Sequence, residues 1–251
     1  MSTFLWVIVP YVCLAIFVVG HFWRYRYDKF GWTTRSSQLY EDRLLRWGSP
    51  MFHFGMLWVV LGHFLGLVIP KSYTSFIRED IYHAVAVVGG MIAGVLATVG
   101  IIILIYRRRT TGPVFSATTP MDKVMYLVLA TVIFLGMLNT LNSSGAIAVG
   151  MDGHYDYREG VSVWFRSIFW FQPQPELMTE APWSFQAHSL TAFLLFALWP
   201  FTRLVHVFSA PLGYLTRPYI VYRSSDSRPG TGVGTRAPKR GWDRSELTKK
   251  K

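Results

Sequence analysis

The sequence predicts an all-α membrane protein, a five-transmembrane-helix bundle with its N-terminus outside the cell and its C-terminus in the cytoplasm. Two observations give this fold class. Hydrophobic residues make up 51% of the 251 positions, and apolar stretches recur that reach the roughly 20 residues a helix needs to cross a bilayer. Five stretches qualify, at residues 4–22, 50–69, 82–106, 122–142 and 185–208.

The basic residues give the orientation of these helices. Lysine and arginine number six in 23–49, four in 107–123 and ten in 209–251, but only two each in 70–81 and 143–184. Basic connections face the cytoplasm, so this alternation places the N-terminus outside. The net charge of +11 then reflects topology and contact with anionic lipid rather than binding of nucleic acid.

The first and fifth stretches need separate comment. The first is not expected to be a cleavable signal peptide, because it lacks a basic start and a small-residue cleavage site. It holds Cys13, the one cysteine, so disulfide, zinc and covalent haem-attachment patterns are absent from the sequence. In the fifth stretch, Pro200 interrupts the apolar run and Arg203 lies near its end. We expect Pro200 to kink this helix rather than to end it.

Two segments lie outside the spans. The segment VSVWFRSIFWF at 161–171 is aromatic but too short to cross a bilayer, so we expect it to lie at the membrane surface. The stretch 224–251 is rich in Gly, Pro, Ser and basic residues and predicts a disordered cytoplasmic tail. The membrane domain then covers 1–223.

Two histidines lie in the second stretch and two in the fifth. His53 and His63 are the only ionisable groups in FHFGMLWVVLGHFLG (52–66), and His188 and His206 lie near the two ends of the fifth stretch. Because the two helices run in opposite directions, His63 and His188 fall near the outer side. His53 and His206 fall near the cytoplasm.

Helical geometry supports this pairing only in part. The 18-residue spacing in the fifth helix is five full turns, so its two imidazoles share a face. The ten-residue spacing in the second helix leaves its imidazoles about 80° apart. The rise along the axis between the two histidines also differs, about 27 Å in the fifth helix against about 15 Å in the second. We expect helix tilt and the kink at Pro200 to absorb the difference.

The chemistry of facing imidazole pairs favours haem. A zinc site needs further ligands at one depth, and a proton relay needs carboxylates in the interior of the spans, where none occurs. Haem iron takes one neutral imidazole on each side, so the pairs predict two stacked bis-histidine haems that transfer electrons. A histidine that bonds a neighbouring helix remains the alternative for each position.

Three glycines flank the second-helix histidines. Gly55, Gly62 and Gly66 would let a flat macrocycle approach the backbone. Close packing of helices is an equal explanation for each of them.

The sequence resembles the gamma subunit of respiratory membrane-bound nitrate reductase, a dihaem cytochrome b, in its actinobacterial form. The resemblance covers about residues 10 to 223 and rests on four motifs. They are RYRYDKFGWTTRSSQL (24–39), FHFGMLWVVLGHFLG (52–66), RRRTTGPVFSATT (107–119) and WPFTRLVHVFSAPLGYLTRPY (199–219).

The resemblance implies a specific role for the four histidines. His63 and His188 would hold the outer haem b, and His53 and His206 the inner one. The subunit would lie in the bacterial plasma membrane and oxidise quinol, here menaquinol, at the outer side. Electrons would pass to an iron–sulfur beta subunit and on to a molybdenum-containing alpha subunit, which reduces nitrate.

One departure from the family concerns the quinol site. The family's lysine before a Gly-Gly in the third helix has no counterpart in REDIYHAVAVVGG (78–90). Quinol oxidation needs a hydrogen-bond acceptor and a proton path, so His83 is our candidate, with Tyr82 and Arg78 behind it. A histidine that anchors a helix end at the interface is the alternative.

The arginines after the third helix are open to two interpretations. Arg107, Arg108 and Arg109 could pair with haem propionates, or they could be ordinary positive-inside anchors.

Two other functions stay open. The first is a dihaem cytochrome b that serves another redox complex, such as a formate dehydrogenase or a sulfur-compound reductase. The second is a haem-free membrane anchor or transporter, which would need polar, discontinuous spans around a substrate.

Overall fold

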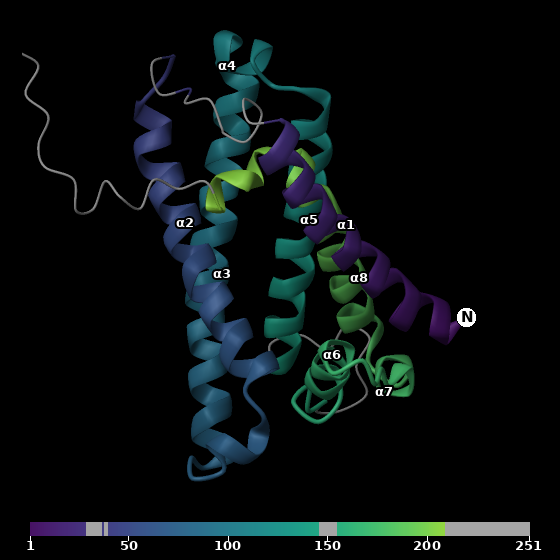
Figure 1. Ribbon diagram of the computed structural model, residues 1–251. Helices are drawn as coiled ribbons and strands as arrows, with labels where there is room; N and C mark the ends of the chain where they lie inside the picture. Colours follow the sequence, from purple (N-terminus) through teal and green to yellow (C-terminus); the bar gives the residue numbers. More distant parts are fainter. Residues whose placement is uncertain (29–36, 38–39, 146–154, 209–251) are drawn as a thin grey trace, which may run out of the picture. The chain divides into compact units, whose positions relative to one another are not determined.

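The computed structural model describes residues 1–28, 37, 40–145 and 155–208, and all regular elements in these ranges are helices (Figure 1). The chain divides into two units, Met1–Ala210 and Pro211–Lys251, and the second lies outside the described residues, as does the predicted tail 224–251. Among the described residues, four helical stretches are long and apolar enough to cross a membrane. They are Phe4–Tyr27, Arg43–Val68, Glu79–Thr110 and Pro120–Ser143.

These four stretches confirm the first four predicted helices and extend them at their ends. The first begins as a π-helical turn, η1 (Phe4–Ile8), and continues as α1 (Val9–Tyr27). It runs past the apolar window because polar residues also form helix where water or an ion pair satisfies them. Arg24 and Asp28, one turn apart, form such a pair at 3.1 Å.

The second and third helices form an antiparallel pair (Figure 1). Helix α2 (Arg43–His63) continues as the π-helical turn η2 (Phe64–Val68), and the 3₁₀ turn η3 (Lys71–Thr74) leads to α3 (Glu79–Thr110). Small residues line the contact: a Cβ added at Gly55 of α2 would lie 2.5 Å from the backbone nitrogen of Ala97 in α3. Such residues let helix backbones approach closely where no hydrophobic effect drives association.

We therefore expect Gly55→Ala to destabilise the fold by about 1–3 kcal/mol, the usual effect of overpacking a fixed contact. Gly62→Ala, on the same helix, is the matched control, because a Cβ there meets no atom within 4 Å. Thermal unfolding of both variants in detergent measures the difference. Equal unfolding temperatures would show that α2 and α3 do not pack through Gly55.

The fourth long helix starts with a well-defined cap. After the short helix α4 (Gly112–Ser116), helix α5 (Pro120–Ser143) begins with a capping box. The hydroxyl of Thr119 accepts from the backbone N–H of Asp122 at 3.1 Å, and the Asp122 carboxylate accepts from the backbone N–H of Thr119 at 3.0 Å. This exchange satisfies two amides that a helix start otherwise leaves without partners.

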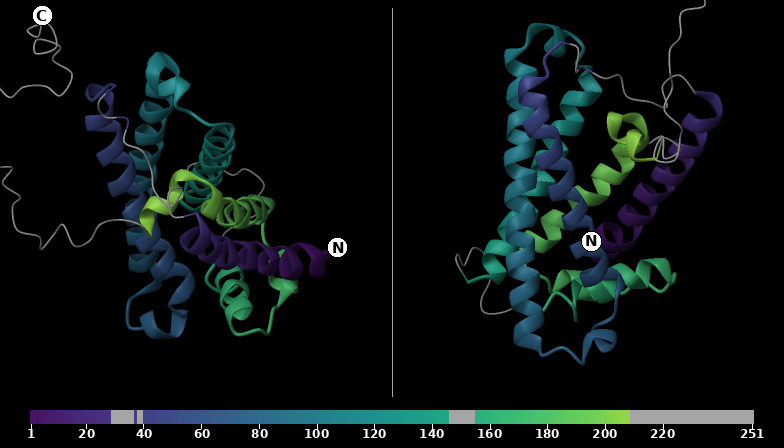
Figure 2. Two further views of the ribbon diagram at one scale, coloured as in Figure 1. Left: turned by 45° about the horizontal axis from the view of Figure 1, so that its top comes forward. Right: turned by 90° about the vertical axis from the view of Figure 1, so that its left-hand side faces the viewer.

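Helices α6 (Val161–Phe169) and α7 (Pro175–Thr179) lie across the end of the bundle where the chain passes from α2 to α3. Figure 2 shows them crossing that end, which we call the lower end because it is lowest in Figure 1. Helix α6 buries Trp164, whose indole N–H donates to the backbone oxygen of Trp6 at 3.0 Å. Trp170 and Phe171, just after it, are exposed. The segment predicted to lie at the membrane surface is therefore a helix with one face in the core.

The last described elements correct one prediction. Helix α8 (Trp183–Leu198) ends before Pro200, and the 3₁₀ turns η4 (Trp199–Phe201) and η5 (Arg203–Val207) follow. The expectation that Pro200 only kinks a continuous helix is wrong. Proline has no N–H for the bond to the residue four positions earlier, and Thr202 is extended, with φ −119° and ψ 176°. At 16 residues, α8 alone is shorter than the usual span.

Two apolar clusters hold α8 in the bundle. One joins its buried Phe193 to Trp6 of η1 and to Trp164 of α6. The other joins Leu195 to Ile101 of α3 and Leu129 of α5. Helix α8 is thus fixed on two sides, and its histidine is held at a defined position.

Candidate functional site

Four histidines from distant parts of the chain meet in two pairs. The rings of His63, at the end of α2, and His188, in α8, have centroids 6.1 Å apart and planes inclined by 32°. The rings of His53 in α2 and His206 in η5 have centroids 5.8 Å apart and planes inclined by 68°. The structure therefore brings together the same residues that the sequence matches by depth. We call His63 and His188 the lower pair, and His53 and His206 the upper pair.

All four imidazoles have the same kind of hydrogen bond. Each Nδ1 lies against a backbone carbonyl oxygen, which can only accept, so Nδ1 carries the proton and Nε2 keeps its lone pair. A hydrogen bond from one ring nitrogen to a carbonyl is the usual support for a histidine that binds metal through the other. The acceptors are Ser49 for His53 (2.7 Å), Val59 for His63 (2.8 Å), Val132 for His188 (3.1 Å) and Arg203 for His206 (2.7 Å).

The separation of the rings fits one metal ion between each pair. An imidazole binds a first-row metal at about 2 Å, and its ring centre lies about 1 Å farther back, so two opposed ligands have centres about 6 Å apart. The two pairs, at 6.1 and 5.8 Å, match this value. Within the described ranges, no group of three or more His, Cys, Asp or Glu side chains gathers around a common point. The donors at each depth are therefore two imidazoles.

The end of α8 removes the mismatch in rise between the two histidine-bearing helices. From His188 to the end of α8 at Leu198 is ten residues, the same spacing as from His53 to His63, which is about 15 Å of helix. Beyond Leu198, the turns η4 and η5 carry the chain across toward α2 (Figure 1). His206 therefore lies beside His53 without the 27 Å rise of an unbroken helix.

The glycines near the histidines have mixed roles. Gly55 packs against α3, and a Cβ at Gly66 would lie 2.9 Å from the Tyr157 hydroxyl, so these two serve packing. Gly62 has open space around it. Sequence reasoning missed Gly136 of α5, where a Cβ would lie 3.1 Å from Cε1 of His188. Its signal was a single glycine inside the apolar stretch 122–142.

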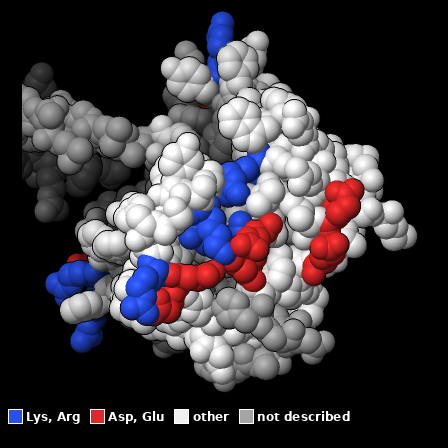
Figure 3. Space-filling view, turned by 90° about the horizontal axis from the view of Figure 1, so that it is seen from below, with Lys and Arg blue, Asp and Glu red and all other residues white. Residues whose placement is uncertain are grey.

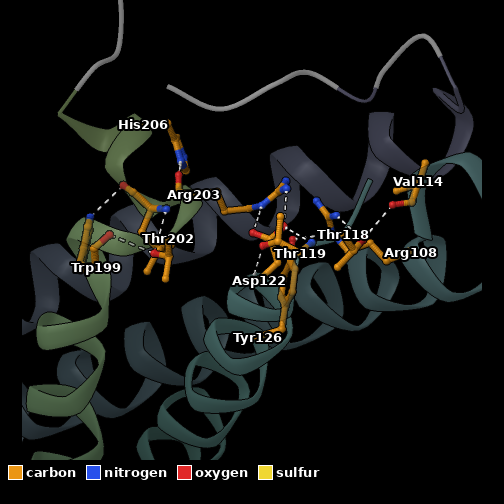
Figure 4. Close-up of polar contacts among 11 residues, drawn as sticks. Arg108, Val114, Thr118, Thr119, Asp122, Tyr126, Trp199, Thr202, Arg203 and His206 are labelled. Carbon is orange, nitrogen blue, oxygen red and sulfur yellow. Dashed lines mark hydrogen bonds and ion pairs between the residues drawn. The ribbon is translucent and has the colours of Figure 1, made fainter. Parts of the chain in front are cut away.

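The upper end holds a buried polar network, part of which is drawn in Figure 4. Arg108 donates to the Tyr126 hydroxyl at 2.9 Å and to Thr118 at 3.0 Å. Arg107 pairs with Glu41 at 2.6 Å and is almost fully buried, whereas Arg109 is exposed. Arg107 and Arg108 thus have protein partners that tie α3 to its neighbours, and contact with haem propionates stays a prediction for all three arginines.

Glu41 has two partners in this network. Its carboxylate accepts from the backbone N–H of Leu44 at 2.7 Å and from Arg107. Burial acts to raise the pKa of Glu41, but these hydrogen bonds and the charge of Arg107 hold it below its usual value. The carboxylate is thus ionised in the neutral range, and it links the start of α2 to the end of α3.

The lower end carries a cluster of mixed charge that sequence reasoning missed (Figure 3). Lys71 lies 2.7 Å from Asp156, 2.8 Å from Glu159 and 3.0 Å from Glu79. Hydrogen bonds to these three carboxylates raise the pKa of Lys71. The cluster ties the segment after residue 154 to the connection between α2 and α3.

Two of the candidate quinol residues, Tyr82 and Arg78, have different side-chain partners. The guanidinium of Arg158, itself buried, lies 4.0 Å from the ring centre of Tyr82 and donates to Thr74 at 2.7 Å. Burial raises the pKa of the neighbouring Tyr157 to about 12. Arg78 instead forms an exposed pair with Asp80 at 2.7 Å. Tyr82 is therefore built into the lower end, together with Arg158 and Tyr157.

His83 follows Tyr82 in the first turns of α3 and is partly buried. It thus lies at the same end of the bundle as the lower pair. Nothing in its sequence neighbourhood pointed to Arg158 or Tyr157, because both come from a segment more than 70 residues away.

The ion pairs of Lys71 predict a pH dependence. Burial acts to raise the pKa of Asp156, but the hydrogen bond from Lys71 holds it below its usual value. Stability from this lowered pKa is complete above the ordinary value of about 3.9 and is lost as the pH falls through the folded value. We expect the unfolding temperature to fall below about pH 4, and to fall less steeply in Lys71→Met. Arg78→Met, which removes an exposed pair, should match the wild type. Identical slopes for all three proteins would contradict the assignment.

Comparisons with known proteins agree on one family. The family model of the nitrate reductase gamma subunit matches residues 2–225. The chain is 44% identical to the nitrate reductase gamma chain of Bacillus subtilis, over 87% of this chain and 96% of that protein. It is 33% identical to the respiratory nitrate reductase 2 gamma chain of Escherichia coli, over 89% and 97%.

A third relative is longer than this chain. The nitrate reductase-like protein NarX of Mycobacterium tuberculosis is 58% identical over 96% of this chain. The match spans only 36% of the length of that mycobacterial protein.

Proposed function

The chain belongs to the nitrate reductase gamma subunit family, and we propose that it is a dihaem cytochrome b that carries electrons from membrane quinol to the other subunits of a nitrate reductase. The observation that carries this proposal is the arrangement of four histidines in two facing pairs, with ring centres 6.1 and 5.8 Å apart. Nitrate itself would be reduced on another subunit.

The residues fit two b-type haems. In each pair, both Nδ1–H groups donate hydrogen bonds to backbone carbonyl oxygens. Both Nε2 atoms would therefore be available as ligands of a haem iron. Gly136 gives the His188 ring the space it occupies. Two haems held by these histidines would supply one-electron transfer chemistry.

The proposed topology has five crossings in the bacterial plasma membrane. Four helices have the required length, and α8 with its following turns supplies the fifth. The positive-inside pattern supports an N-terminus outside. The lower pair then lies toward the outer side and the upper pair toward the cytoplasm, so the two pairs mark a path across the bilayer.

Quinol, as menaquinol, would be oxidised at the lower end. The reaction needs a group that accepts a hydrogen bond from the quinol hydroxyl and takes its proton. His83 is the proposed acceptor, Tyr82 stands beside it, and Arg78 lies at the start of α3. The charged cluster around Lys71 provides carboxylates through which protons could reach the outer aqueous phase.

Replacing His83 tests the quinol site. We expect His83→Ala to slow the reduction of the haems by a menaquinol analogue at least tenfold while both haems remain bound. The physical reason is the loss of a proton acceptor in the transition state, an effect typically of 10²–10⁴ for general bases. Stopped-flow absorbance measures the rate, and Arg78→Ala serves as a comparison at the same helix end. Unchanged quinol kinetics in His83→Ala would exclude this residue.

The proposed partners are an iron–sulfur beta subunit and a molybdenum-containing alpha subunit. A direct test uses the complex purified through this chain and assays quinol-driven nitrate reduction. The proposal predicts that the molybdenum enzyme co-purifies and that quinol oxidation stops when this chain is removed, while a small dye can still donate electrons to the remaining subunits. Co-purification with a formate dehydrogenase or a sulfur-compound reductase would instead favour that complex.

A further inference from the structure

His206 of the upper pair is supported differently from the other three histidines. His53 and His63 donate to carbonyls four residues earlier in the same α-helix, and His188 donates to Val132 of the long helix α5. His206 donates to Arg203, three residues earlier, in a 3₁₀ turn. Hydrogen-bond geometry in a 3₁₀ turn is poorer than in an α-helix. The orientation of the His206 ring therefore depends on what holds Arg203.

Asp122 of α5 holds Arg203. Its two carboxylate oxygens accept from Nε of Arg203 at 2.9 Å and from a terminal guanidinium nitrogen at 3.1 Å (Figure 4). This bidentate arrangement fixes the direction of the guanidinium as well as its position. Asp122 is fixed in turn, because the same carboxylate caps the start of α5 through Thr119.

Hydrogen bonds within the η4–η5 segment hold the backbone around Arg203. The Trp199 indole donates to the backbone oxygen of Leu204 at 2.8 Å, and the Thr202 hydroxyl donates to that of Trp199 at 3.0 Å. These bonds close the turn around the Arg203 carbonyl. Asp122 is buried, and a buried carboxylate is costly unless it is paired, so the pair is a strong constraint on the turn.

We propose that the Asp122–Arg203 ion pair is the positioning element of the upper haem ligand: it fixes the carbonyl that orients His206 toward His53. The inference rests on the proposed function, because it assigns His206 to a haem. Asp122 and Arg203 are positioning residues, since they act through the backbone of η5 and the Nδ1 of His206.

The test uses the full chain with its haems and three single variants. Asp122→Asn keeps the shape of the side chain and weakens the pair, and Arg203→Lys keeps the charge and loses the bidentate geometry. Thr119→Ala removes the capping hydroxyl of α5 but leaves the pair intact, so it is the matched control. Electron paramagnetic resonance of the oxidised protein reports the two bis-histidine haems separately, and a redox titration gives their midpoint potentials.

We expect the signal of the upper haem in Asp122→Asn and Arg203→Lys to shift or to lose at least half its intensity. Its reduction equilibrium should change about tenfold, which is 59 mV for one electron. The lower-haem signal should stay as in the wild type, which also shows that the variants fold, and Thr119→Ala should leave both signals unchanged. An upper-haem signal and potential unchanged in both variants would overturn the proposal, as would equal loss of both haems.

A second measurement separates this inference from the proposed function. Nitrogen NMR of the histidine-labelled chain without haem reports the tautomer of each ring. The inference predicts the Nδ1–H form of His206 in the wild type and exchange between forms in Asp122→Asn. If the wild type lacks two low-spin haems, the proposed function fails, while this measurement still decides whether the ion pair orients His206. An Nδ1–H form that persists in Asp122→Asn would contradict the inference.

Discussion

Replacement of His63 by alanine is expected to reduce the haem content from two per polypeptide to one, with the lower haem lost and the upper haem retained. The His53→Ala variant should give the opposite result. The reason is that, in the proposed function, each macrocycle would depend on one imidazole from α2 and one from α8 or η5, with no covalent attachment to hold it when one ligand is removed. Haem extraction with a pyridine assay, together with the low-spin signals of the oxidised protein, measures both effects.

His21→Ala is the matched control for these variants. The Nδ1 of His21 also bonds a backbone oxygen, that of Phe17, at 2.7 Å, and its ring packs on the rings of Phe17 and Phe208. We expect His21→Ala to keep two haems. Loss of haem in the control, or retention of both haems in His63→Ala, would remove the basis for the assigned pairs.

The second large effect concerns the direction of electron flow. In His206→Ala, a menaquinol analogue should still reduce the lower haem, but delivery of electrons to the cytoplasmic subunits should fall at least 100-fold. In His188→Ala, quinol should reduce neither haem at a significant rate. The asymmetry follows from the proposed quinol site at the lower end, with His83 and Tyr82, which would make the lower haem the first acceptor. Rapid-mixing spectroscopy of the assembled complex resolves the two steps.

The reverse outcome would place the quinol site elsewhere. Fast reduction of the upper haem in His188→Ala would mean that quinol binds near the upper pair. In that case the cluster around Lys71 and the stacked pair of Arg158 and Tyr82 would have a structural role only. Arg78→Ala in the same assay controls for a general effect of charge at the lower end.

The sequence predicts the long helices well because apolar length alone determines them. Residues 82–106 contain no charge, and α3 covers them entirely, from Glu79 to Thr110. The helix ends are less predictable, since they depend on local partners such as Asp28 for Arg24 and the capping box at Thr119. These contacts extend each helix beyond its apolar window.

The effect of Pro200 on its helix cannot be predicted from the neighbouring sequence alone. Its missing N–H weakens the helix in every context. Whether the helix kinks or ends there depends on which residues bind the segment that follows the proline. Here Arg203 meets Asp122, a residue 81 positions away, and the turn is held by that contact. No pattern within residues 185–208 contains this information.

The candidate site also has a part that the sequence predicts and a part that it does not. The four histidines could be found from the sequence because imidazoles in apolar helices are rare and costly. The cluster of Lys71 with Asp156 and Glu159, and the stacking of Arg158 on Tyr82, join segments that are distant in sequence. In the sequence, Lys71, Asp156, Glu159 and Arg158 look like ordinary loop charges until the fold brings the segments together.

The most direct test of the account is a difference spectrum of the purified chain, reduced with dithionite minus oxidised, with haem quantified per polypeptide. We expect two low-spin b-type haems, one lost in His63→Ala and the other in His53→Ala. A folded preparation that binds no haem, or one whose haem content does not depend on these histidines, would contradict it.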